Sequence, residues 1–103
     1  AIYKSEYSRY SAQGYLDVIF LNNQGEFTEG AISNLIIQKR NRRYTPPLSS
    51  GLLPGIYRNY LIKRRLVKER VIKRDDLRAA DKVFLCNSVH GLREVKIVDK
   101  AVK

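Results

Sequence analysis

A glycine stands directly ahead of a predicted helix in the stretch Leu53-Pro54-Gly55-Ile56-Tyr57, and such an arrangement can bind phosphate. The first N–H groups of a helix have no partner within it, and the helix dipole gives them a partial positive charge. These two features make the start of a helix a possible phosphate-binding site. Glycine-to-helix junctions are common, so an ordinary helix start is the competing interpretation.

A carboxylate, Glu29, follows a predicted hairpin turn at the end of a strand. Most carboxylates are exposed to solvent, and an exposed Glu29 would need no function. A buried Glu29 would need a cationic partner, which the protonated ring nitrogen of a ligand could provide. The residue is therefore a candidate binding group whose significance depends on its burial.

Asn87 and Ser88 follow a predicted strand, and Gly91 allows the loop after them to turn. Amide and hydroxyl groups in this place could bind a ligand or simply form an Asx turn. His90, the single histidine, could carry a proton, although a loop histidine without a partner is more often a surface residue. Cys86 lies in an apolar strand, which favours a buried structural thiol over a nucleophile.

The elements that must position these residues predict a single α+β domain. Strands and helices mix without strict β-α-β alternation, which favours this class over a doubly wound sheet. A turn cluster at residues 22–25 predicts a hairpin, and Asp75 or Asp76 is expected to cap a short helix. Apolar runs predict strands over residues 15–21, 31–38, 69–72, 83–86 and 95–98, and a helical pattern covers residues 56–68.

The composition limits the class of protein. The chain has 103 residues, of which 44% are hydrophobic, and this is enough for one domain with a modest core. No apolar run approaches the roughly 20 residues of a membrane-spanning helix. The single cysteine excludes an internal disulfide and fits a reducing compartment. We therefore expect a cytoplasmic protein with no membrane partner and no metal site.

The net charge of +10 is concentrated in two basic clusters, at residues 39–43 and 63–65. Such a charge is typical of nucleic-acid-binding proteins, because phosphate neutralisation dominates their affinity. The sequence nevertheless lacks zinc-ligand spacing, an aromatic RNA-binding signature and an obvious helix-turn-helix. Basic clusters are usually solvated, so we expect the 39–43 cluster to be a surface loop with no nucleic-acid partner. A basic pocket would also suit a small anionic substrate or cofactor.

Several motifs follow one another along most of the chain. They are Asp17–Asn22, Gly25–Gly30, Ser33–Leu35, Tyr44–Leu48, Gly51–Arg58, Glu69-Arg70, Asp76-Leu77, Ala80-Asp81 and Phe84–Val89. In residue types and in order they resemble the motifs of the class IV aminotransferases, and the resemblance extends from Asp17 to about Asp99. The resemblance implies the C-terminal, cofactor-binding half of a pyridoxal 5'-phosphate enzyme. The implied fold is that of the D-amino-acid aminotransferase-like enzymes, with a mixed sheet and flanking helices.

The resemblance also implies roles for residues that could bind the cofactor. Glu29 corresponds to the glutamate that pairs with the pyridine nitrogen, and a protonated nitrogen makes the ring an electron sink. The backbone of Gly55, Ile56 and Tyr57 corresponds to the phosphate-binding helix start, in agreement with the dipole argument. Asn34 belongs to the motif that follows Glu29 and is implied as a further cofactor-binding residue.

Two more roles follow from the same resemblance. Asn87 and Ser88 correspond to a second loop that reaches the phosphate and the substrate. Lys4 is the candidate for the catalytic lysine, which forms a Schiff base with the cofactor and moves the substrate's α proton. The interval between Lys4 and Glu29 is shorter than usual in the family, and Arg9 stands one position later than the family's arginine. A solvated surface lysine is therefore the alternative for Lys4.

Cys86-Asn87-Ser88, followed by Gly91-Leu92, resembles the aminodeoxychorismate lyase branch, including forms fused to a 4-aminobenzoate synthase component. This branch implies folate biosynthesis, with pyruvate released from 4-amino-4-deoxychorismate to give 4-aminobenzoate. A branched-chain or D-amino-acid aminotransferase is the alternative, and a non-catalytic basic nucleic-acid-binding module is a further one. Family members carry a preceding N-terminal domain and share active sites in a dimer. We therefore expect that domain as a partner, a homodimer, and doubtful activity for the isolated chain.

Overall fold

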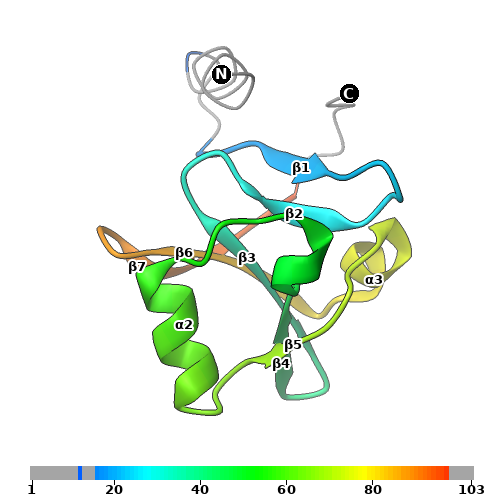
Figure 1. Cartoon of the computed structure of the whole chain (residues 1–103). Coiled ribbons are helices and arrows are strands. Elements are labelled where there is room, and N and C mark those ends of the chain that lie inside the picture. Colours follow the sequence, from blue (N-terminus) through cyan, green and yellow to red (C-terminus); the bar gives the residue numbers. More distant parts are fainter. Residues whose placement is uncertain (1–11, 13–15, 98–103) are drawn as a thin grey trace.

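The structure, a computed structural model, describes residue 12 and residues 16–97. Within them, a β-hairpin lies over one face of a five-stranded mixed sheet, and two α-helices flank the sheet (Figure 1). The predicted α+β class with a mixed sheet and flanking helices is confirmed. The hairpin pairs β1 (Ile19–Leu21) with β2 (Phe27–Gly30). The sheet has the order β5-β4-β3-β6-β7, formed by β3 (Asn34–Lys39), β4 (Arg42–Thr45), β5 (Lys68–Glu69), β6 (Lys82–Asn87) and β7 (Gly91–Val95).

The central strand β3 is buried on both faces, which explains its unbroken apolar run. Successive side chains of a strand point to opposite faces of the sheet. Leu35 and Ile37 therefore pack against the β1–β2 hairpin and the helix α3 (Arg74–Ala79). Ile36 packs on the other face against the helix α2 (Ile56–Lys63). Each fully buried aliphatic side chain of this kind contributes about 1.5–3 kcal/mol to the free energy of unfolding.

The helix predicted over residues 56–68 ends earlier, at Lys63. Arg65 has a φ of 59°, in the left-handed region, and the chain turns there. The N–H of Leu66 donates to the carbonyl of Leu61 at 3.0 Å, and Val67 is then buried against the sheet. The apolar spacing that predicted one helix thus arises from a helix followed by a tertiary contact.

The basic segment at residues 39–43, predicted as a polar loop, is instead a tight hairpin between β3 and β4. Arg40 and Asn41 have φ values of 52° and 66°, and two successive positive values are typical of a type I′ turn. The carboxylate of Asp81 accepts a hydrogen bond from the N–H of Arg40 at 2.9 Å, which fixes the turn. Arg40, Asn41 and Arg42 are exposed, as predicted. Arg43 is instead half-buried, since its Nε donates to Gln38 Oε1 at 2.9 Å and its guanidinium lies 4.5 Å from the centre of the Phe84 ring.

Other element boundaries are also corrected by pairings that local pattern does not reveal. The loop expected at Asn87 and Ser88 shortens to a turn, because Asn87 pairs directly with Gly91 and β7 begins there. The N-cap of α3 is Lys73 rather than an aspartate. Asp76 still stabilises this helix start, since its carboxylate accepts a hydrogen bond from the N–H of Lys73 at 2.9 Å. Among the described residues, no helix is long and apolar enough to cross a membrane.

Candidate cofactor-binding site

Glu29, on β2, is buried, with only 9% of its surface exposed. Its Oε1 accepts a hydrogen bond from the N–H of Leu53 at 3.3 Å. Burial raises the pKa of Glu29 above its ordinary value, the Leu53 N–H opposes this shift, and the nearby Asp17 carboxylate adds to it. Within residues 16–97, no lysine, arginine or histidine forms an ion pair with Glu29. The carboxylate therefore meets the condition under which a cationic ligand would stabilise it.

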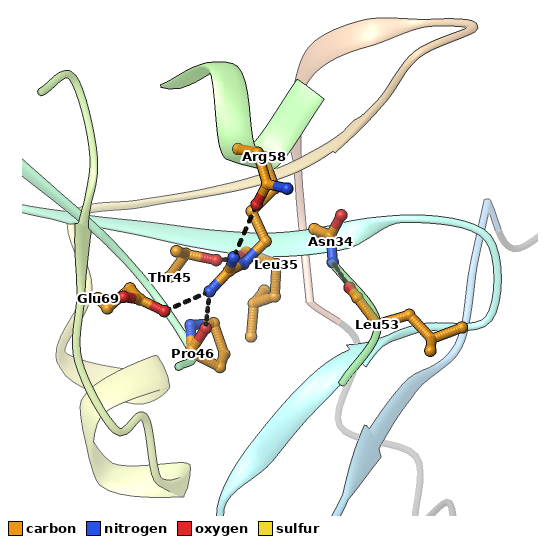
Figure 2. Close-up of polar contacts among 8 residues, drawn as sticks. Asn34, Leu35, Thr45, Pro46, Leu53, Arg58 and Glu69 are labelled. Atoms are coloured by element: carbon orange, nitrogen blue, oxygen red, sulfur yellow. Dashed lines mark hydrogen bonds and ion pairs between the residues drawn. The ribbon is translucent and has the colours of Figure 1, made fainter. Parts of the chain in front are cut away.

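The Asn34 side chain connects Glu29's neighbour Leu53 to the helix start. Asn34 Nδ2 faces the carbonyl of Leu53 at 3.5 Å, the long limit of a hydrogen bond, and Figure 2 shows this amide directed at the Leu53 backbone. A Cβ at Gly55 would overlap the Asn34 amide oxygen. Position 55 must therefore be glycine if Asn34 is to pack against the helix start.

The start of α2 has no side-chain cap. Its N-cap residue is Gly55, and the first turn contains no acidic residue. The carbonyl of Gly55 accepts the N–H of Asn59 at 3.0 Å, which begins the helical hydrogen bonds. The N–H groups of Ile56 and Tyr57 lie ahead of that first bond and carry the positive end of the dipole. The Ile56 side chain is 80% exposed, so its contribution here is through its backbone.

Asn87 ends β6 beside the beginning of β3. Its Nδ2 lies 3.3 Å from both the Ile32 carbonyl and the Ser33 hydroxyl. Its Oδ1 accepts hydrogen bonds from the N–H groups of Val89 and His90 at 3.0 and 2.7 Å. Asn87 thus forms the Asx turn considered as an alternative, and it also ties the β6–β7 turn to the β2–β3 turn. Ser88 is exposed on this turn.

These contacts bring most of the predicted site residues to one end of the central strand. Glu29 and Asn34 both contact Leu53, and Gly55 packs against Asn34. On the neighbouring strand, Cys86 pairs with Asn34, which places Asn87 next in line. On the other side of α2, a Cβ at Gly91 would lie 3.2 Å from the ring of Tyr57, so the helix start borders the β6–β7 turn. Lys4 lies outside the described residues.

Within the part of the chain that the structure describes, the two other residues considered in the sequence, Cys86 and His90, show no arrangement suited to catalysis. Cys86 is a free cysteine with 1% of its surface exposed, and burial raises its pKa to about 11. A thiol with this pKa is not a nucleophile near neutral pH, so the predicted buried structural thiol is confirmed. His90 is exposed, and its backbone N–H bonds to Asn87.

Sequence reasoning assigned no role to Asp17, which shapes the turn between Glu29 and Asn34. Its carboxylate accepts hydrogen bonds from the N–H groups of Val18 and Ala31 at 2.7 and 2.8 Å. Burial raises its pKa, whereas these backbone donors oppose the shift. A Cβ at Gly30 would overlap this carboxylate, so the glycine after Glu29 was the available signal in the sequence.

The sequence model of the amino-transferase class IV family matches residues 3–98. The chain belongs to the class IV aminotransferase family. It is 38% identical over 91 residues to the branched-chain-amino-acid aminotransferase of Escherichia coli K12, covering 84% of this chain and 29% of that protein. It is 35% identical over 86 residues to the aminodeoxychorismate lyase of Saccharomyces cerevisiae, covering 79% of this chain and 23% of that protein.

Solved structures agree with this assignment. The branched-chain amino acid aminotransferase of Escherichia coli superimposes with a TM-score of 0.80 at 37% identity, over 90% of this chain and 33% of that one. The 4-amino-4-deoxychorismate lyase of Pseudomonas aeruginosa superimposes with a TM-score of 0.76 at 29% identity, over 86% and 35%. The predicted family is confirmed, and its members are pyridoxal-phosphate enzymes; one, from Thermobaculum terrenum, was solved in its PLP-form. The chain spans about a third or less of the relatives named here, and both activities occur among them.

Proposed function

We propose that this chain is the pyridoxal-phosphate-binding part of a class IV enzyme. The observation that supports this most directly is the burial of Glu29 without a cationic side chain from the described residues, close to an uncapped helix start. A buried carboxylate needs a positive partner, and an uncapped helix start needs an anionic one. A protonated pyridine ring that carries a phosphate offers both on one small molecule.

We assign the following roles toward this cofactor to the described residues. Glu29 would hold a proton at the pyridine nitrogen, and its raised pKa would fall again beside that cation. The N–H groups of Ile56 and Tyr57 would donate to the phosphate, because the N-cap residue Gly55 has no side chain that could cap them. When bound, the protonated cofactor ring supplies an electron sink for the carbanion left by substrate deprotonation.

The other predicted site residues would complete the binding of cofactor and substrate. Asn34 keeps Leu53 and Gly55 together and so orients Glu29 and the helix start. Ser88, exposed on the turn that Asn87 closes, would reach the phosphate or the substrate. Lys4 would bind the cofactor covalently and carry the substrate's α proton as general acid and base.

We further propose that the reaction is the 4-amino-4-deoxychorismate lyase reaction, in which one substrate gives 4-aminobenzoate and pyruvate. The β6–β7 turn at the candidate site contains the motif that resembles the lyase branch, Cys86-Asn87-Ser88 followed by Gly91-Leu92. This reaction would place the enzyme in folate biosynthesis, in the cytoplasm, with a small anionic substrate. A branched-chain or D-amino-acid aminotransferase is the second candidate, supported by the 38% identity to the Escherichia coli enzyme.

The chain would act as the C-terminal half of a longer enzyme. It covers 29% of the Escherichia coli relative, so most of a complete enzyme's residues have no counterpart in it. We infer that an N-terminal domain supplies the rest of the phosphate and substrate contacts, and that the complete enzyme is a homodimer. Experiments on activity and cofactor binding therefore require the chain together with this N-terminal domain.

Two measurements test the function. Titration with pyridoxal phosphate should produce a visible or near-ultraviolet band of bound cofactor, and the absence of such a band would contradict the cofactor proposal. Incubation with 4-amino-4-deoxychorismate should then release pyruvate, measured with lactate dehydrogenase and NADH. Exchange of amino groups between branched-chain amino acids and 2-oxo acids without pyruvate release would favour the aminotransferase.

The charge offers a separate test against a nucleic-acid-binding module. Binding of DNA or RNA should be weak and should disappear at physiological salt, because only residues 40–42 of the basic hairpin are exposed to solvent. Tight binding that survives this salt, and is lost when Arg40, Arg42 and Arg43 become alanine, would support the module instead.

A further inference from the structure

Arg58 is a charged side chain buried in the first turn of α2, directly after the proposed phosphate-binding residues. Only 2% of its surface is exposed. Its Nη2 donates to the carbonyl of Pro46 at 2.9 Å and to Glu69 Oε2 at 2.7 Å, and Figure 2 shows both bonds running from the Arg58 side chain to these two residues. Its Nη1 lies 3.2 Å from Asn59 Oδ1. Burial of a guanidinium is costly, so these contacts require an explanation.

The groups that hold Arg58 lie on or next to hydrogen-bonded strands of the sheet. Pro46 follows β4, whose last residue, Thr45, is completely buried. Thr45 Oγ1 donates to the Leu35 carbonyl on β3 at 2.6 Å, and its own carbonyl accepts the N–H of Arg70 at 2.9 Å. Arg58 thus ties the first turn of α2 to the point where β3, β4 and β5 are joined.

Because the start of α2 has no side-chain cap, the contacts of Arg58 can serve to hold its first turn in place. A serine or aspartate N-cap would stabilise the helix by about 0.5–2 kcal/mol, but its oxygen would occupy the same N–H groups that a phosphate needs. Gly55 leaves those groups open and provides no side chain to hold the turn in place. Asn34 limits movement on one side of the turn, and Arg58 can limit it on the other.

The charge of Arg58 also argues against a simple packing role. A cation in the first turn of a helix opposes the dipole, so an apolar residue would be the more stable choice for packing alone. The Nε atom is buried with no hydrogen-bond partner among the described residues, which adds a further cost. The guanidinium instead provides directed contacts: Nη2 donates to both Pro46 and Glu69, and Nη1 donates to Asn59 from the same planar group.

From these contacts we infer that Arg58 and Glu69 form a positioning pair, which holds the first turn of α2 so that its N–H groups are aligned for an anionic phosphate. The inference rests on the proposed function for the identity of the ligand. Whether the pair holds the first turn of α2 can be measured without any ligand. The hydrogen bond from the Asn59 N–H to the Gly55 carbonyl closes this turn, and its stability reports on the turn.

The test compares Arg58→Met, Arg58→Lys and Glu69→Gln, with the N-terminal part of the enzyme present. Arg70→Gln is the matched control, because it also removes one positive charge from the same region but from a side chain that contacts Asp76 and the Tyr44 ring. Each variant is titrated with pyridoxal phosphate and with pyridoxal, which lacks the phosphate. Hydrogen exchange of the Asn59 amide is measured without cofactor, and a thermal melt verifies folding.

We expect Arg58→Met to weaken pyridoxal phosphate binding about tenfold or more while pyridoxal binding stays the same. Arg58→Lys should lose less, and Glu69→Gln should show a smaller loss of the same kind. Asn59 exchange should accelerate in Arg58→Met and Glu69→Gln and remain unchanged in Arg70→Gln. If Arg58→Met does not fold, Glu69→Gln decides, since the Glu69 side chain is 43% exposed and its replacement is mild.

Equal weakening of both ligands, or unchanged phosphate affinity together with unchanged Asn59 exchange in Glu69→Gln, would overturn the positioning role. A wild-type protein that binds neither ligand would contradict the proposed function instead. In that case accelerated Asn59 exchange in Glu69→Gln still supports the pair as the anchor of the helix start, and unchanged exchange refutes it.

Discussion

Replacement of Glu29 by glutamine is the most informative single change in the candidate site. The two side chains are similar in volume, and the glutamine oxygen can still accept the hydrogen bond from the Leu53 N–H. The fold should therefore persist. What the substitution removes is the negative charge of a side chain with only 9% of its surface exposed.

Without cofactor, Glu29→Gln should stabilise the protein at neutral pH. Burial raises the pKa of Glu29 in the folded state, so between its ordinary value of 4.5 and the raised value the folded state holds more protons than the unfolded state. The free energy of unfolding of the wild type then decreases as the pH rises through this window, and the cost persists above it. The gain from Glu29→Gln should therefore be present at pH 7 and disappear as the pH falls below 4.5.

With cofactor and the N-terminal part present, the same substitution should be harmful. A neutral amide cannot pair with a protonated pyridine nitrogen, and a hydrogen bond to a charged group contributes about 1.5–3 kcal/mol. This corresponds to a loss of roughly tenfold to a hundredfold in kcat, as a minimum. The assay is pyruvate release for kcat, the visible spectrum for bound cofactor, and thermal melts with and without cofactor. Wild-type turnover in Glu29→Gln would refute the assignment and leave Glu29 as an ordinary strand-end carboxylate.

Three further predictions concern neighbouring parts of the chain. Gly55→Ala should lower the free energy of unfolding by about 1–3 kcal/mol, because its Cβ would overlap the Asn34 amide, and should weaken cofactor binding; a thermal melt and a cofactor titration measure both. Lys4→Ala should still bind cofactor through the phosphate but lose the absorbance band of the covalently bound form, and a retained band would make Lys4 a surface lysine. Cys86 should not react with a thiol reagent at pH 8 until the protein is unfolded, because its pKa is about 11 and it is buried; fast labelling of the native protein would contradict this.

The sequence alone determined the family and the chemistry expected of it. Tight turns and uncapped helix starts are local requirements that select particular residue types, above all glycine. The sequence therefore revealed the turn glycine before β2, the Glu29 motif and the glycine ahead of α2. The apolar runs of β3 and β6 likewise identified strands, because both strands are buried on two faces. These local signals were sufficient for the α+β class and for most of the candidate site.

The tertiary structure decided which of these residues are buried and what they touch. Glu29 and Leu53 are 24 residues apart, and the burial of the carboxylate depends on the β1–β2 hairpin meeting the segment before α2. In the same way, Arg58 was only the last residue of a motif in the sequence, and its burial depends on its contacts with Pro46 and Glu69. Burial and hydrogen-bond partners depend on contacts between segments that are distant in the chain, so no local sequence pattern predicts them. These contacts are what identify Glu29 and Arg58 as candidate functional residues.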